Sequence, residues 1–250
     1  MQWGIGALFG VYGLAIGSFL AVCIERLSCG ESVRGRSHCP ACGKKLGWSD
    51  LVPLVSFLIL GGQCQYCGAK ISWRYPFIEG GTALLFAACG YCFGFSGQAV
   101  VWCAVFSVLI IISGLDGLTG EIHDEWNGVL AGLGVLMVWL EGDYTWQQAL
   151  LGAGIVSVPL AVIAWVTGGI GGGDVKMMAA LGVVLGPRLV VLDFFIGCVS
   201  AALVSVGLMI LGKVHRRSTI AWGPFLALGA VVAILAGDTV VDWYLNLLRA

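Results

Sequence analysis

Residues 1–22 read MQWGIGALFGVYGLAIGSFLAV, and no charged side chain occurs before Glu25. A transmembrane helix needs about 20 consecutive apolar residues, so this stretch is long enough to cross a bilayer. It lacks the small-residue cleavage site that ends a removable signal peptide. The stretch therefore predicts a retained membrane-spanning helix at the start of the chain.

The composition of the whole chain extends this prediction. Of the 250 residues 59% are apolar and only 11% are charged, whereas soluble proteins have about 25% charged residues. A water-soluble globule is therefore excluded, and with a net charge of -1 no basic surface for nucleic acid is expected. Seven further apolar runs predict helices at residues 76–95, 98–115, 126–140, 146–166, 175–186, 189–211 and 222–237. We expect an all-α polytopic membrane protein with about eight transmembrane helices.

Two of these runs, 126–140 and 175–186, are shorter than a straight crossing requires. Each of them could be tilted, extended into its flanking loop or partly re-entrant. Their boundaries are the least defined part of the predicted topology.

Basic residues predict the orientation of the helices. They concentrate in the first loop and in the loop before the last run: Arg26, Arg34, Arg36, Lys44, Lys45, Lys70, Arg74, Lys213, Arg216 and Arg217. Because cytoplasmic loops carry the excess of Lys and Arg, the first loop should be cytoplasmic. Because successive helices cross the membrane in opposite directions, the loops 116–125, 168–174 and 213–221 should also be cytoplasmic. Both termini, Glu141 and Asp143 fall on the other side, with only Arg188 and Arg249 as basic residues there.

The first loop contains two Cys-x-x-Cys motifs, Cys39 to Cys42 and Cys64 to Cys67, each followed by a glycine. Two such motifs about twenty residues apart are typical of a zinc ribbon, in which four thiolates form a closed tetrahedral site. Disulfides are disfavoured because the cytosol keeps thiols reduced. We expect a small zinc-binding insertion between the first and second helices, although redox or unligated cysteine pairs remain an alternative.

Two acidic motifs lie on the predicted cytoplasmic side. Asp116 ends the third apolar run, and Asp174 follows the glycine-rich residues 168–173. Two carboxyl groups that share a site do not both ionise readily: one keeps a proton and polarises a carbonyl, while the other takes a proton from water. Glycines at this point let a backbone approach closely because no Cβ intervenes. The pattern therefore favours the chemistry of an aspartic protease.

Other interpretations of the same residues remain open. The aspartates could merely cap helix ends, with Asp124 as the N-cap of the fourth run. A transporter or channel could use the carboxylates to bind protons or cations, and it would then show flux without cleavage. A non-catalytic scaffold that binds a partner through its cysteine module would be insensitive to Asp-to-Asn changes.

In combination, these motifs resemble those of bacterial type IV prepilin peptidases, the prepilin leader peptidase/N-methyltransferases. Residues 17–27 (GSFLAVCIERL) resemble the opening signature of that family, and residues 71–79 (ISWRYPFIE) resemble the segment that enters its second helix. The two cysteine pairs resemble its cytoplasmic cysteine motif. Residues 116–124 and 171–176 resemble its two aspartate motifs, so the likeness extends over nearly the whole chain.

The resemblance implies that Asp116 and Asp174 are the catalytic pair of a GxGD-type intramembrane aspartyl protease in the bacterial inner membrane. Four further residues are expected to support the pair: Asp124, Gly171, Gly173 and Lys176. The cysteines implied as metal ligands are Cys39, Cys42, Cys64 and Cys67. The chain would comprise a first helix (1–23), a cytoplasmic four-cysteine loop (24–75) and a transmembrane peptidase core (76–250).

The implied substrate is a prepilin or pseudopilin of a type IV pilus or type II secretion system, and membrane lipid is the other expected partner. The family removes a short basic leader by cleaving after a glycine on the cytoplasmic side of a hydrophobic helix. Many members then methylate the new N-terminus with S-adenosylmethionine. The sequence shows no independent pattern for binding this cofactor, so a peptidase without methyltransferase activity remains an alternative.

Overall fold

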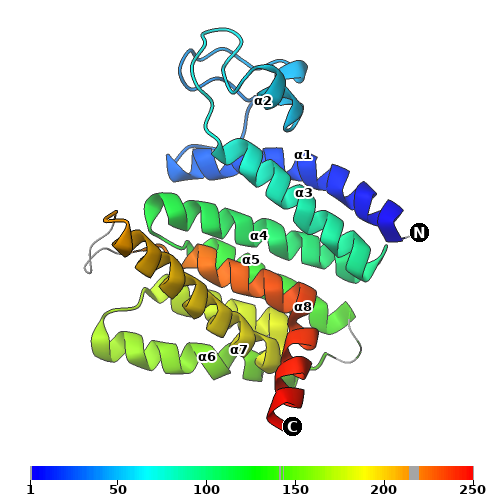
Figure 1. The fold of residues 1–250 in the computed structure, drawn as a ribbon, viewed down its shortest axis with the longest axis vertical. Helices are drawn as coiled ribbons and strands as arrows, with labels where there is room; N and C mark the ends of the chain where they lie inside the picture. Colours follow the sequence, from blue (N-terminus) through cyan, green and yellow to red (C-terminus); the bar gives the residue numbers. More distant parts are fainter. Residues whose placement is uncertain (1, 141, 143, 214–219, 250) are drawn as a thin grey trace. The chain divides into compact units, whose positions relative to one another are not determined.

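The computed structural model describes residues 2–140, 142, 144–213 and 220–249. Seven longer helices account for most of them: α1 (Gln2–Ser28), α3 (Arg74–Phe93), α4 (Gly97–Thr119), α5 (Asp124–Leu140), α6 (Trp146–Thr167), α7 (Gly172–Ile210) and α8 (Gly223–Arg249). Two short helices, η1 (Trp48–Leu51) and α2 (Val55–Ile59), lie in the loop between α1 and α3 (Figure 1). Four residues used to predict orientation lie outside the described residues: Glu141, Asp143, Arg216 and Arg217.

The prediction of an all-α membrane protein is confirmed. Within the described ranges, six helices are long and apolar enough to cross a membrane, namely α1, α3, α4, α6, α7 and α8. The difference from the expected eight has two causes. Helix α5 has only 17 residues, and α7 contains both the predicted runs 175–186 and 189–211.

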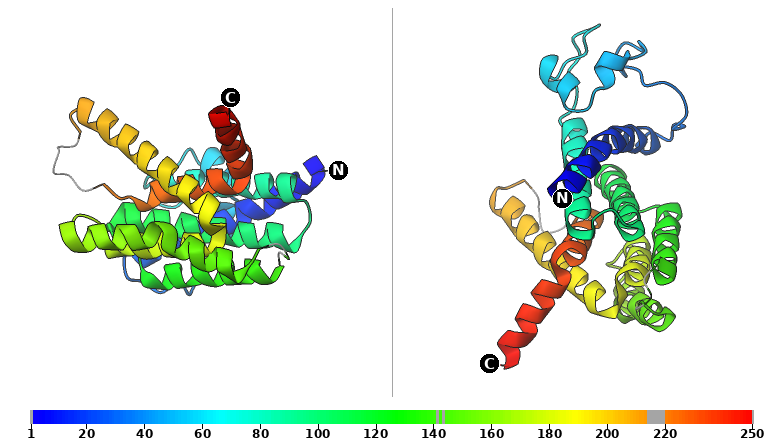
Figure 2. Two further views of the ribbon diagram at one scale, coloured as in Figure 1. Left: turned by 90° about the horizontal axis from the view of Figure 1, so that it is seen from below. Right: turned by 90° about the vertical axis from the view of Figure 1, so that its right-hand side faces the viewer.

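Gly186 separates the two runs within α7. Its backbone has φ 73° and ψ 175°, which is not helical, and glycine adopts such a conformation more readily than residues with a Cβ. Pro187 follows and cannot donate a backbone hydrogen bond. The two halves of α7 are therefore separate helices joined by a sharp bend (Figure 2), in agreement with the two predicted runs.

The chain forms two compact units, Met1–Ile111 and Ile112–Ala250. In the first unit α1 packs against α3 through glycines (Figure 1). A Cβ at Gly13 would lie 2.7 Å from the Cα of Ala83, and one at Gly17 would lie 2.8 Å from the Cα of Glu79. Small residues allow such backbone approach in membrane helices, where dispersion contacts replace the hydrophobic effect as the driving force.

In the second unit α7 packs against α5, α6 and α8. Gly152 of α6 and Gly182 of α7 approach so closely that a Cβ on either one would overlap the backbone of the other helix. Asp193, in the second half of α7, is fully buried against Gly229 of α8. This packing fixes the beginnings of α7 and α8 within one unit, where the acidic motifs lie.

Candidate functional site

The two Cys-x-x-Cys motifs fold into matching turns. The backbone N–H of Cys39 donates to Lys44 O over 3.0 Å, and the N–H of Cys64 donates to Ala69 O over 2.8 Å. Both turns end in a glycine with positive φ, 69° at Gly43 and 71° at Gly68. Left-handed backbone at these positions favours glycine, which explains why a glycine follows each motif.

The turns bring the four predicted ligands, Cys39, Cys42, Cys64 and Cys67, into one cluster. All four Sγ atoms lie within 4.8 Å of one another, and those of Cys39 and Cys67 are 3.9 Å apart. Tetrahedral zinc with Zn–S bonds of about 2.3 Å requires Sγ atoms about 3.8 Å apart. The cluster therefore has the donor atoms and the spacing to hold a metal ion.

The local backbone also favours the metal-binding form of one thiol. Backbone N–H groups of Cys42 and Ala41 donate to Cys39 and lower the pKa of its thiol to about 7. A thiolate is the form that binds a metal ion. The backbone of the motif thus partly stabilises the negative charge of the Cys39 thiolate, independently of a metal ion.

Asp116, near the end of α4, is buried against the first residue of α8. Its Oδ2 accepts a hydrogen bond of 2.7 Å from the backbone N–H of Gly223, and the residue is 5% exposed. A Cβ at Gly223 would lie 2.8 Å from the same Oδ2. The N-terminus of a helix carries partial positive charge, so this contact both orients the carboxylate and stabilises its ionised form.

Asp174 occupies the first turn of α7, where its carboxylate lies beside Gly171, the residue that precedes the helix. A Cβ at Gly171 would lie 2.8 Å from Asp174 Oδ2. The charges of Asp174 and Asp116 are close enough to interact. The structure thus places the two predicted carboxylates in one neighbourhood, each seated against a glycine at the beginning of a helix.

Gly173, the other predicted glycine, is contacted from two sides. A Cβ there would lie 2.9 Å from the Cβ of Ile122, and Asn127 Nδ2 donates to Gly173 O over 3.4 Å. Within the described residues the Oδ1 of Asn127 is buried without a hydrogen-bond partner. Gly173 thereby lets the segment before α5 pack closely on the first turn of α7.

The remaining predicted residues form an exposed ion pair. Lys176 Nζ lies 2.6 Å from Asp124 Oδ2, and both side chains are more than half exposed. The pair links the beginnings of α5 and α7. Exposed pairs of this kind contribute about 0–1 kcal/mol, so neither residue holds the carboxylate pair in place by itself.

Sequence reasoning missed two residues, Gly223 and Asn127. Gly223 lies 107 positions from Asp116, so local spacing could not connect them. The one available signal was the dipeptide Gly223-Pro224 at the start of a predicted apolar run, because proline is common in the first turn of a helix. Asn127 is a polar residue within an apolar run, and such residues often face a neighbouring helix.

Comparison with known proteins finds two family profiles that match successive parts of the chain. A family profile described as the bacterial peptidase A24 N-terminal domain matches residues 11–93, and the profile of the type IV leader peptidase family matches residues 103–206. A prepilin leader peptidase/N-methyltransferase from Bacillus subtilis is 34% identical over 243 residues, which cover 95% of this chain and 96% of that protein. The chain belongs to the type IV leader peptidase family.

Other members of the type IV leader peptidase family are similar over comparable lengths. The prepilin leader peptidase/N-methyltransferases of Aeromonas hydrophila and Pseudomonas aeruginosa are each 30% identical, and they cover 98% and 94% of this chain and 96% and 91% of their own lengths. No solved structure matches the chain. The six candidate spans and these relatives identify a multi-pass membrane protein, and its cysteine cluster falls within the N-terminal match.

Proposed function

We propose that this protein is an intramembrane aspartyl endopeptidase that removes the leader peptide of type IV prepilins or pseudopilins. One observation carries the proposal: Asp116 and Asp174 interact within the same unit, and each is seated against a glycine at a helix N-terminus. Family membership supports the substrate class, because the relatives are prepilin leader peptidases.

In the proposed reaction one carboxylate takes a proton from water as the water oxygen bonds to the scissile carbonyl carbon. The other, protonated carboxyl group donates to the carbonyl oxygen. When the C–N bond breaks, a proton passes to the leaving nitrogen and the amine is released. The Gly223 N–H fixes Asp116 during these transfers, so the carboxylate does not need to reorganise.

We place the reaction at the cytoplasmic face of the bacterial inner membrane. The basic first loop supports this orientation, and alternation of the eight helical runs brings both aspartate motifs to that side. A carboxylate pair close to this face reaches a bond at the junction between a soluble leader and a membrane helix. The Lys176–Asp124 pair and the glycines Gly171 and Gly173 would support the pair by fixing the start of α7.

The second proposed activity is N-methylation of the newly formed N-terminus with S-adenosylmethionine as methyl donor. The names of the relatives support it, since each is a prepilin leader peptidase/N-methyltransferase. Methylation would follow cleavage because the accepting amine does not exist before the leader is removed.

The experiment that tests both activities uses the purified full-length protein in detergent with a prepilin and S-adenosylmethionine, followed by mass spectrometry of the pilin. We expect loss of the leader mass and a gain of one methyl group. A mature pilin of unmodified mass would contradict methylation alone. An intact prepilin, together with proton or cation flux in proteoliposomes, would instead support the transporter interpretation.

We further propose that the cysteine cluster binds one structural Zn²⁺ ion within a cytoplasmic segment comprising residues 24–75, between the first helix (1–23) and the peptidase core (76–250). The closed set of four thiol groups leaves no position for a substrate, and structural zinc sites are closed in this way. The ion would join the two turns of a loop that has little other regular structure.

Elemental analysis tests this zinc proposal. The wild-type protein should contain about one zinc ion per chain, and replacement of Cys39 and Cys64 by serine should remove it, because one ligand is lost from each turn. Cys92→Ser is the matched control, since Cys92 is exposed on α3 outside the cluster. Unchanged zinc content in the double variant would show that the cysteines do not hold the metal.

A further inference from the structure

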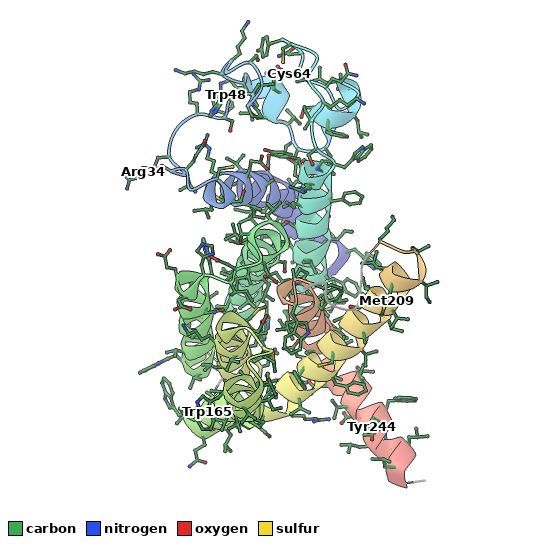
Figure 3. All side chains as sticks on the ribbon, turned by 90° about the vertical axis from the view of Figure 1, so that its left-hand side faces the viewer. Arg34, Trp48, Cys64, Trp165, Met209 and Tyr244 are labelled. Atoms are coloured by element: carbon green, nitrogen blue, oxygen red, sulfur yellow. The ribbon has the colours of Figure 1, made fainter. Side chains whose placement is uncertain are left out.

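The loop between α1 and α3 exposes apolar side chains that its own packing does not use. Figure 3 shows the side chains of this loop, with Trp48 and Cys64 labelled. Helix α2 buries Phe57, whereas the neighbouring Leu58 and Ile59 are 73% and 77% exposed. Val55 is exposed as well, and residues three and four positions apart share one face of a helix. One face of α2 therefore packs on the protein, and the opposite face is open to a partner.

The buried face of α2 fixes this helix to the beginning of α3. The ring of Phe57 packs edge-on against that of Trp73, with centroids 4.9 Å apart, which is a favourable arrangement for two aromatic rings. The backbone N–H of Leu54, just before α2, donates to Glu79 Oε2 over 2.8 Å. Glu79 is a buried residue of α3. These two contacts hold α2 beside the first turns of a membrane helix.

The turn that leads into α2 has an unusual backbone. Leu54 has φ 60° and is the one residue other than glycine with positive φ in the described part of the chain. A bulky residue rarely adopts this conformation, and such strain persists only where the surrounding structure enforces it. The direction of α2 is therefore set by a fixed bend, and the exposure of its outer face is a property of the fold.

The outer face of α2 continues into an exposed side of α3. Trp73 and Phe77 are both exposed, and their ring centroids are 6.4 Å apart. Leu84 lies seven residues after Phe77, on the same side of α3, and it is exposed too. Because α3 is long and apolar enough to cross a membrane, this side faces acyl chains. The apolar surface that adjoins it, named the α2 patch, consists of Val55, Leu58, Ile59, Trp73 and Phe77.

Basic residues accompany the α2 patch. Lys70 and Arg74 are exposed on either side of Trp73 in the sequence, and within the described residues neither forms an ion pair. Residues 24–75 contain seven basic and three acidic side chains. Tryptophan is enriched at membrane–water interfaces, and basic side chains beside a membrane helix attract the anionic lipids of the cytoplasmic leaflet. Apolar exposure and charge thus point to the same partner, a lipid surface.

We propose that α2 is an interfacial anchor that inserts the α2 patch into the cytoplasmic leaflet, while Lys70 and Arg74 bind the phosphate groups of anionic lipids. The outer face of α2 lies at the boundary between headgroups and acyl chains, as amphipathic surface helices do. The anchor holds the four-cysteine loop against the membrane beside α3. This role is separate from the peptidase chemistry and requires neither a prepilin nor a methyl donor.

Photo-crosslinking to lipid tests the anchor in the full-length protein. The protein is reconstituted in nanodiscs of phosphatidylcholine and phosphatidylglycerol that contain a lipid with a diazirine in its acyl chain, and labelled peptides are mapped by mass spectrometry. Label should appear on α2 and on the peptide that contains Trp73. Leu58→Ser combined with Ile59→Ser should lower the label at Trp73 by about fivefold or more, because less apolar surface enters the lipid.

Val33→Ser is the matched control, since Val33 is an exposed apolar residue of the same loop outside the α2 patch. Its label at Trp73 should equal that of wild type. Label on α1 and α8 is the internal standard, and it should be unchanged in every variant that is correctly folded and inserted. Wild-type protein labelled on these helices but not on α2 or at Trp73 would overturn the anchor.

The lipid composition tests the role of the basic residues. In nanodiscs of phosphatidylcholine alone, the wild-type label at Trp73 should fall by about threefold or more. Lys70→Gln combined with Arg74→Gln should give the low value in both compositions. Label that does not depend on phosphatidylglycerol would overturn the binding of anionic headgroups. Crosslinks between the α2 patches of two copies, in place of lipid label, would show that this surface joins protein chains instead.

Discussion

Replacing either Asp116 or Asp174 by asparagine will reduce prepilin cleavage by about a thousandfold or more. Asparagine keeps the size of the side chain but neither accepts a proton from water nor donates one as an acid. Each proton transfer by a positioned group contributes about 10²–10⁴-fold to a rate. Because the two carboxyl groups act together, the double variant should be hardly slower than either single variant.

The rate should be measured under single-turnover conditions with purified protein and a prepilin substrate. Asp238→Asn is the matched control, because Asp238 is an exposed carboxylate on α8 whose Oδ1 lies 3.8 Å from Arg188 Nη1. It should cleave at the wild-type rate. Methylation of a pilin that has already been cleaved should persist in both dyad variants. Wild-type cleavage by either Asp116→Asn or Asp174→Asn would reject the proposed pair.

Substitution of Gly223 by alanine should lower cleavage by about a hundredfold. The new Cβ would meet Asp116 Oδ2 at 2.8 Å, a separation that forces the carboxylate or the start of α8 to move. A displacement of about 1 Å at a reacting group can cost about 10²-fold in rate. Gly223 contacts Asp116 and not the substrate in this proposal, so kcat should fall while KM changes little.

Gly128→Ala is the control for this prediction. Gly128 is exposed on α5 with open space around it, and alanine there should preserve activity and favour the helix by up to about 1 kcal/mol. Full activity of Gly223→Ala would show that the hydrogen bond to Asp116 is not needed for catalysis. A parallel rise in KM would indicate that Gly223 contacts the substrate directly.

Much of the fold could be predicted because membrane helices follow from local composition. Every predicted apolar run overlaps a helix, although the runs 76–95, 189–211 and 222–237 extend one or two residues beyond it. The break at Gly186 falls at the end of the run 175–186, just before the run 189–211 begins. The length of α8 was not predictable in this way. Its last turns contain Asp238 and Asp242, which interrupt the apolar pattern but pair with Arg188 of α7. Such long-range pairing is not visible in hydropathy.

The candidate site was predictable to the extent that its residues are unusual for their surroundings. The paired cysteines have a spacing that few other structures require, and Asp116 is a carboxylate at the end of an apolar helix. Gly223 is different because its role arises from the packing of the start of α8 against α4.

The bend at Gly186 also determines how much bilayer the first half of α7 can cover. Residues 172–185 rise only about 21 Å at 1.5 Å per residue, whereas the hydrocarbon core is about 30 Å thick. Lipid beside this half must compress, or one end of the helix must lie inside the core. Asp174 is in its first turn, so local thinning would lower the headgroups and their hydration water toward the carboxylates. The mismatch would thus supply a hydrolytic enzyme with water at a depth where an undisturbed bilayer is dry.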